Sequence, residues 1–160
     1  MAKLRVLQIT KADLDADNFY IGEEDVTDFE GSIEIAAHLG HVKFKGGLEA
    51  RGFIRALAGS GIEAGWGISA GSGISAGSGI EAGEGISAGE GISAGWGIEA
   101  GFRIFAGVSI YLKSPSPDRR RIQCKRLLGG EVCYGDLVET GVATEPSGTE
   151  DEAPAENAQR

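Results

Sequence analysis

Residues 59–107 read GSGIEAGWGISAGSGISAGSGIEAGEGISAGEGISAGWGIEAGFRIFAG, and this stretch decides the fold. Isoleucine recurs every six residues from Ile62 to Ile110, and alanine follows each isoleucine by two residues except at the last. A helix needs apolar residues about 3.6 positions apart, and two glycines in each period would cost it about 1 kcal/mol apiece. The six-residue period therefore excludes a helix.

Each period contains one short strand and one corner. In Ile-x-Ala the first and third side chains point to the same face, as in a half-buried strand. Gly-x-Gly then predicts a turn, because glycine adopts backbone conformations that other residues avoid. A chain that alternates short strands with corners in this way is predicted to form a β-solenoid.

A second period lies in the residues between isoleucine and alanine. From Glu63 to Glu99 they follow the order Glu-Ser-Ser-Glu-Ser-Ser-Glu, so glutamate returns at every third six-residue unit. Three such units would complete one coil, so Glu63, Glu81 and Glu99 would stack on one side. The serines would form two further columns, one of which continues to Phe105 and the other to Tyr111. The sequence thus predicts an all-β fold, a triangular parallel β-helix with about 18 residues per coil.

The remaining segments divide the chain into four parts. Residues 1–32 are predicted to form an N-terminal strand and a capping segment, since the end of a repeat stack needs a cap. The β-solenoid is expected over residues 33–112, with its regular repeats at 59–107. Residues 113–141 predict a basic segment and a C-terminal β-hairpin around Gly129–Gly130, a two-residue turn signal. Residues 142–160 form an acidic tail that we expect to be disordered.

Charge and hydropathy narrow the class of partner. The chain has 160 residues and a formal net charge of -9, which argues against direct binding to nucleic acid or to an anionic membrane and favours a basic protein partner. No apolar run reaches the roughly 20 residues that span a bilayer. The first residues lack the apolar region of a secretory signal, so we expect a cytoplasmic protein.

The phrase GIEAGWGISAGSGISAG resembles the hexapeptide-repeat β-helix proteins, and the resemblance covers about Ile54 to Leu112. It implies the architecture alone. Acyltransferases of that class use a histidine near the coils as general base, whereas His38 and His41 lie upstream of the regular repeats. We therefore expect no catalytic residue, no cofactor and no metal site, and an acyltransferase is the least favoured alternative.

A looser resemblance is to the acidic pentapeptide-repeat proteins that mimic DNA. It implies a narrow rod with glutamates in register, a surface suited to a nucleic-acid-binding partner. One glutamate per coil gives one charge per about 4.8 Å, compared with about 1.7 Å in duplex DNA and 3.4 Å in a single strand. Glu84 and Glu90, at corners, raise this density. The alternative is that the glutamates form only a solvated side copied by repeat duplication.

This pattern leads to a specific functional expectation. We expect an inhibitor of a basic-grooved nucleic-acid-binding complex, such as an anti-CRISPR or anti-restriction protein of a phage or mobile element. The alternative class is a self-assembling scaffold that resembles the bactofilins, in which an acidic rod with a basic end associates head to tail. A homo-oligomer through the solenoid end or the aromatic corners is a further possibility.

Two further groups of residues are candidates for binding. Trp66, Trp96 and Phe102 occupy corner positions, and exposed aromatic residues are enriched in binding hot spots. The alternative for Phe102, Phe105 and Tyr111 is that the C-terminal hairpin covers them. The second group is a basic cluster that could bind phosphate or an acidic partner, or could neutralise the protein's own carboxylates; it comprises Arg119, Arg120, Arg121, Lys125 and Arg126.

Overall fold

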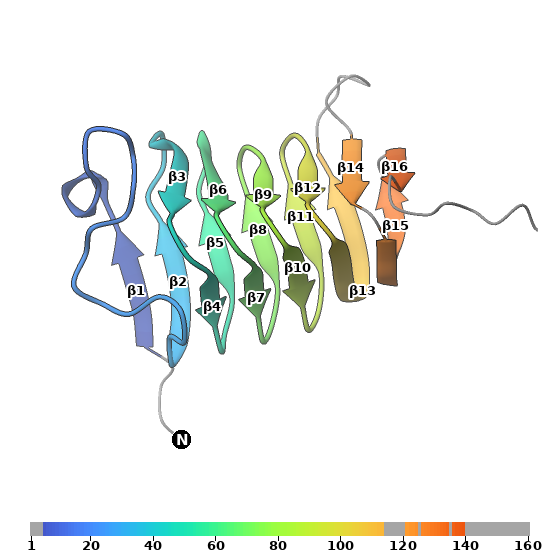
Figure 1. Ribbon diagram of the computed structural model, residues 1–160, viewed down its shortest axis with the longest axis horizontal. Helices are drawn as coiled ribbons and strands as arrows, with labels where there is room; N and C mark the ends of the chain where they lie inside the picture. The colour runs from blue at the N-terminus through green and yellow to red at the C-terminus, as the bar shows by residue number, and fades with distance from the viewer. Residues whose placement is uncertain (1–4, 114–120, 125, 135, 140–160) are drawn as a thin grey trace, which may run out of the picture.

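The computed structural model describes residues 5–113, 121–124, 126–134 and 136–139, and their strands stack in parallel into an elongated β-solenoid (Figure 1). The all-β solenoid predicted from the six-residue period is confirmed. Three columns of strands form three sides, which we number in chain order from the first complete coil.

The strands of one side pair with the equivalent strands of the neighbouring coils. Side 1 contains β3 (Gly40–Phe44), β6 (Ser60–Ala64), β9 (Ile80–Ala82), β12 (Ile98–Ala100), β14 (Arg121–Cys124) and β16 (Asp136–Glu139). Side 2 contains β4 (Leu48–Ala50), β7 (Ile68–Ala70), β10 (Gly85–Ala88) and the first part of β13 (Arg103–Leu112). Side 3 contains β1 (Arg5–Ile9), β2 (Gly31–Ile35), β5 (Ile54–Ala56), β8 (Ile74–Ala76), β11 (Ile92–Ala94) and the last part of β13.

The length of the coil changes along the rod. Ile62 pairs with Ile80, the third isoleucine after it, as the Glu-Ser-Ser order of the outward-facing residues predicts. Earlier coils are longer, since Val42 pairs with Ile62, whereas a coil of the regular length would bring Ser60 to that position. The two additional residues lie in the segment LAGSG, residues 57–61, which runs into the first residues of β6, where the regular period begins.

The interior is a stack of isoleucines and alanines. Every isoleucine of the regular repeats is at most 1% exposed, and the alanine columns are at most 7% exposed. Phe44 heads the alanine column of side 1, where it pairs with Ala64 and remains buried. Burial of each isoleucine side chain contributes about 1.5–3 kcal/mol, so hydrophobic stacking between coils is the main source of stability.

The corner glycines serve a different purpose from the one predicted. Among the described glycines only Gly40 and Gly59 have a positive φ, so the corners that follow Gly59 in the regular repeats do not need glycine's backbone freedom. The first glycine of each Gly-x-Gly instead lies against the coil before it. A Cβ on Gly89 would lie 2.1 Å from the carbonyl oxygen of Gly71. Close stacking of coils, rather than turn geometry, therefore demands the first glycine.

The C-terminal β-hairpin is a second correction. Gly129 and Gly130 lie inside one strand, β15 (Arg126–Tyr134), which pairs in parallel with β13. Likewise β14 pairs in parallel with β12 and with β16, so the solenoid continues. A Cβ on Gly129 would lie 2.8 Å from the Phe105 ring. Gly129 makes room for an aromatic ring, and neither glycine turns the chain. The acidic tail at 142–160 lies outside the described residues.

The segment before β2 lies on the N-terminal end of the first coil. After β1 and a short 3-10 helix, η1 (Lys11–Asp13), it forms parallel bridges from Phe19 to Lys43 on side 1 and from Phe29 to Ala50 on side 2. Burial near Phe44 raises the pKa of Tyr20, whose ring lies 5.7 Å from that of Phe44. The capping role of residues 1–32 stays a prediction, which these contacts favour.

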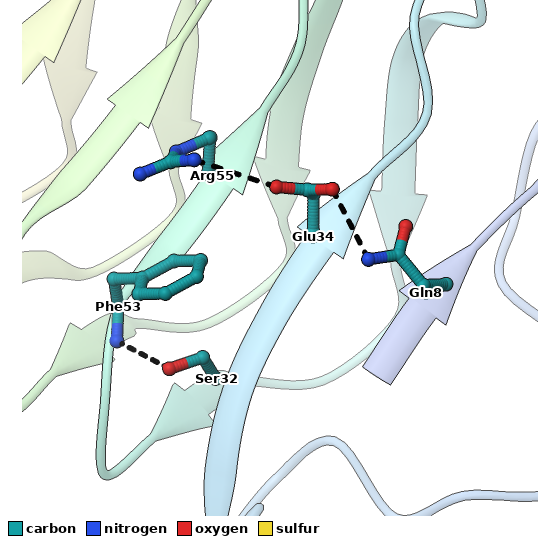
Figure 2. Close-up of polar contacts among 5 residues, drawn as sticks. All are labelled: Gln8, Ser32, Glu34, Phe53 and Arg55. Atoms are coloured by element: carbon teal, nitrogen blue, oxygen red, sulfur yellow. Dashed lines mark hydrogen bonds and ion pairs between the residues drawn. The ribbon is translucent and has the colours of Figure 1, made fainter. Parts of the chain in front are cut away.

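A polar ladder joins the first strands of side 3 (Figure 2). Gln8 Nε2 donates to Glu34 Oε1 at 3.1 Å, and Arg55 Nη1 lies 3.5 Å from Glu34 Oε2. Ser32 Oγ, which is buried, accepts from the Phe53 N–H at 3.1 Å. The Glu34 carboxylate is thus paired within the protein, in contrast to the carboxylates on side 1.

Replacing Ser60 by alanine is expected to lower the free energy of unfolding by about 1–3 kcal/mol. The fully buried Ser60 hydroxyl donates to Ala36 O at 2.6 Å and accepts from the Leu39 N–H at 2.9 Å, so its loss leaves both groups unpaired. Urea unfolding followed by circular dichroism measures the change.

Ser78→Ala is the matched control. Ser78 follows Ser60 in the same corner and is also buried, yet its hydroxyl makes no hydrogen bond to a described residue. An equal loss of stability in both variants would contradict the role given to the Ser60 hydrogen bonds.

Candidate functional site

Three glutamates form a continuous column on side 1. Glu63 pairs with Glu81, and Glu81 pairs with Glu99, which confirms the stacking predicted from the return of glutamate at every third unit. Lys43 precedes the column in register and Gln123 follows it. None of the ion pairs found between described residues involves these three glutamates. The column, called here the glutamate ladder, therefore carries three carboxylates without a paired cation in the described part of the chain.

A small hollow lies beside the C-terminal half of the ladder. It has a volume of about 150 Å³ and is lined by Glu81, Glu99, Trp96, His41 and Arg121, among others. Trp96 occupies the corner between sides 3 and 1 and is 46% exposed. Trp96 and two residues of the ladder thus border the same space.

His41 limits the size of this hollow. A Cβ on Gly61 would lie 2.4 Å from His41 Cδ2, and one on Gly79 would lie 3.3 Å from His41 Nε2. The imidazole therefore covers the side-1 surface of both glycines. Its Nε2 atom is buried and has no hydrogen-bond partner among the described residues.

Trp66, Glu84 and Phe102 share the corner between sides 1 and 2. The Glu84 N–H donates to Trp66 O at 3.0 Å and the Phe102 N–H donates to Glu84 O at 2.7 Å, so the three residues occupy successive coils. This confirms the prediction that Trp66 and Phe102 lie in one column. The three residues also line a groove of about 840 Å³ on side 2.

Glu90 is separated from the other candidates. It lies in the corner between sides 2 and 3, where its N–H donates to Ser72 O and its carbonyl accepts from the Val108 N–H. The structure therefore divides the predicted partner-binding residues among three places. The first place is side 1, with the three ladder glutamates and Trp96 at its edge. The second is the corner of Trp66, Glu84 and Phe102, and the third is the corner of Glu90.

The chain matches no family model, no curated protein and no solved structure. A functional conclusion therefore rests on the geometry of these surfaces.

The serine columns end in outward-facing aromatic residues, as predicted. Ser87 pairs with Phe105 on side 2, and Ser93 pairs with Tyr111 on side 3. Phe105 and Tyr111 remain 40% and 44% exposed. A folded-back hairpin does not cover them, because β15 continues the solenoid by pairing with β13.

Only part of the predicted basic cluster can be placed. Arg121 is exposed at the start of β14, where it lines the hollow beside Glu81 and Glu99 without forming an ion pair with a described residue. The backbone of Arg126 belongs to β15. Arg119, Arg120 and Lys125 lie outside the described residues. Among the described side chains, the cluster contributes Arg121 next to the C-terminal end of the ladder.

Other classes of site find no support in the described residues. No group of three or more His, Cys, Asp or Glu side chains in them is placed to hold a metal ion. None of their helices is long and apolar enough to cross a membrane.

Sequence reasoning missed Lys43 and His41 as members of side 1. Lys43 pairs with Glu63 and His41 with Gly61, in each case two positions beyond the partner that the regular period would give. The two additional residues in LAGSG were the signal that would have placed them. With Lys43 at one end and Arg121 near the other, the three glutamates form an acidic surface with a cation at each end.

Proposed function

We propose that this protein is a non-catalytic interaction protein whose side 1 binds a basic surface of a protein partner. The observation that supports this most directly is the glutamate ladder, three carboxylates in register without a paired cation among the described residues. Trp96 borders the ladder and supplies an exposed aromatic ring of the kind that anchors protein interfaces.

The cost of the ladder supports a binding role. Like charges directly opposite each other on neighbouring strands destabilise a sheet by up to about 1 kcal/mol per pair. On side 3 no such repulsion arises at Glu34, because its carboxylate accepts a hydrogen bond from Gln8 and pairs with Arg55. Side 1 leaves its three carboxylates available to an external cation, and complementary charge accelerates association with such a partner.

The spacing of the carboxylates favours a partner that holds a single nucleic-acid strand. Successive coils place the ladder charges about 4.8 Å apart, which is closer to the 3.4 Å per charge of one strand than to the 1.7 Å of a duplex. In this proposal the protein inhibits a nucleic-acid-binding complex by occupying its basic groove, as an anti-CRISPR or anti-restriction protein of a phage or mobile element would.

Replacing Glu63, Glu81 and Glu99 together by glutamine is expected to reduce capture of a basic partner at least tenfold while thermal stability stays equal or rises. The opposite signs arise because the substitutions remove both the attraction for the partner and the repulsion within the ladder. Affinity capture from a host lysate, with the captured proteins identified by mass spectrometry, measures the first effect. Thermal unfolding at low salt measures the second.

The matched control is the triple variant Asp17→Asn, Glu23→Gln and Asp28→Asn. It changes the net charge by the same three units, at exposed positions in the N-terminal segment. Equal capture by the ladder variant and the unchanged protein would contradict the proposal. Light scattering that shows polymers growing with concentration would favour the alternative, a self-assembling scaffold.

A further inference from the structure

The groove on side 2 has a floor made of a glycine column. Gly47, Gly67 and Gly85 line it in successive coils, and its volume is about 840 Å³. The corresponding hollow on side 1 is about 150 Å³, because the His41 ring covers Gly61 and Gly79 there. Side 2 therefore keeps open a space that side 1 fills. We call it the side-2 trough.

The two walls of the trough differ in chemistry. One wall is the corner column of Trp66, Glu84 and Phe102, in which the Trp66 and Phe102 side chains are 64% and 52% exposed. The opposite wall is the outward column of β4, β7, β10 and β13, which consists of Glu49, Ser69, Ser87 and Phe105. Rings and a carboxylate thus alternate along the first wall, whereas the second wall has one carboxylate, two serines and one ring.

The dimensions suit an extended peptide. The trough spans four neighbouring strands, about 14 Å at 4.8 Å per strand, which corresponds to four or five residues of an extended chain at about 3.3 Å each. The backbone groups of these strands already pair between coils. A ligand on this side is therefore bound through side chains and not by addition of a strand.

We propose that the side-2 trough binds an extended, arginine-containing segment of a protein partner. An arginine stem lies on the glycine floor, with its guanidinium stacked against Trp66 and paired with Glu84 in the next coil. Guanidinium groups both stack on indole rings and pair with carboxylates, which lysine does less well. This inference rests on the function proposed above for its premise that the partner is a basic protein. The trough adds that the recognised group of the partner is an arginine and that it binds on side 2.

The charges along the trough are arranged to select a cation. Glu49 and Glu84 line it, and neither takes part in an ion pair between described residues. Arg103 lies at the C-terminal end, where its Cγ would be 3.3 Å from a Cβ on Gly85. A bound arginine is attracted by both carboxylates and repelled by Arg103. The three side chains therefore predict effects of opposite sign.

The test is binding of a fluorescein-labelled penta-arginine peptide to the full chain, followed by fluorescence anisotropy. Glu84→Gln and Trp66→Ala are each expected to weaken binding about threefold or more, and Arg103→Ala to strengthen it about twofold. Glu90→Gln, the same charge change at the neighbouring corner, is the control and leaves affinity nearly unchanged. A penta-lysine peptide binds more weakly than penta-arginine. All four positions are exposed, and circular dichroism verifies that each variant is folded.

Four outcomes overturn the inference. One is equal binding of penta-arginine and pentaglycine, and another is an equal effect of Glu84→Gln and Glu90→Gln. The third is self-association that disappears in Trp66→Ala, which assigns the trough to a second copy of the chain. If the Glu63, Glu81 and Glu99 variant alone loses the peptide, this inference fails while the proposed function stands. If partner capture fails while trough variants still alter peptide binding, the proposed function fails and the trough stands.

Discussion

Replacing Gly89 by alanine is expected to lower the free energy of unfolding by about 3 kcal/mol or more, a larger loss than any surface substitution considered above. The added Cβ would lie 2.1 Å from Gly71 O, far inside contact distance. The Gly89 N–H also donates to Ala70 O at 3.0 Å, so the corner cannot move away without loss of that bond. The two coils must separate locally, and every inter-coil contact nearby weakens.

Gly91→Ala is the matched control for this prediction. Gly91 is the second glycine of the same corner, and a Cβ there would lie 3.3 Å from Ser109 O. Its expected cost is less than about 1 kcal/mol, because a shift of a few tenths of an ångström relieves the contact. Urea unfolding of the two variants side by side measures the difference. Equal destabilisation would mean that both glycines are required for backbone conformation, contrary to the observed φ values.

Deleting residues 71–76 is expected to abolish most partner capture although it removes no charge. The deleted GSGISA segment is one side of a coil, and all sides present the same inward isoleucine and alanine, so the remaining chain can still stack. Everything after the deletion rotates by one side. Glu63 stays on side 1, whereas Glu81 and Glu99 move to side 3, next to Arg55. The ladder is broken at constant net charge.

Capture from lysate and thermal unfolding together test this deletion. We expect capture to fall as far as in the glutamine variant of the ladder, with the β-sheet circular dichroism spectrum retained. A deletion of residues 71–88 is the control, because removal of a whole coil restores the register and places Glu63 next to Glu99. It should capture more partner than the six-residue deletion despite having two fewer carboxylates. The reverse order would show that net charge, and not the ladder, controls binding.

Much of the fold could be predicted because its information is local and repeated. Ile62, Ile80 and Ile98 occupy equivalent positions, and each coil contacts only its neighbours, so one period specifies all of the regular coils. The same regularity placed Glu63, Glu81 and Glu99 in one column, and Trp66 and Phe102 in another. Where the period is interrupted, at LAGSG, the prediction missed Lys43 and His41.

The candidate surfaces were predicted only in part. Residues that share a column could be found by counting, but counting does not show which columns border the same space. The structure separates Trp96, beside the ladder, from Trp66, beside the side-2 trough. It also shows that His41 fills the hollow on side 1. Such relations depend on the size and direction of side chains around a corner, which a period does not contain.

By itself, the sequence determined the solenoid, its three sides and the identity of each outward column, since these follow from a strict period and the alternation of side chains in a strand. Only the tertiary structure decided why glycine occupies the corners and how the chain continues after Leu112. At Gly89 the deciding contact is a carbonyl oxygen of the preceding coil, and at Gly129 it is the Phe105 ring. Both contacts join residues about one coil or more apart. The same glycine can therefore permit a turn, a close approach or a ring, and only its neighbours in space distinguish these roles.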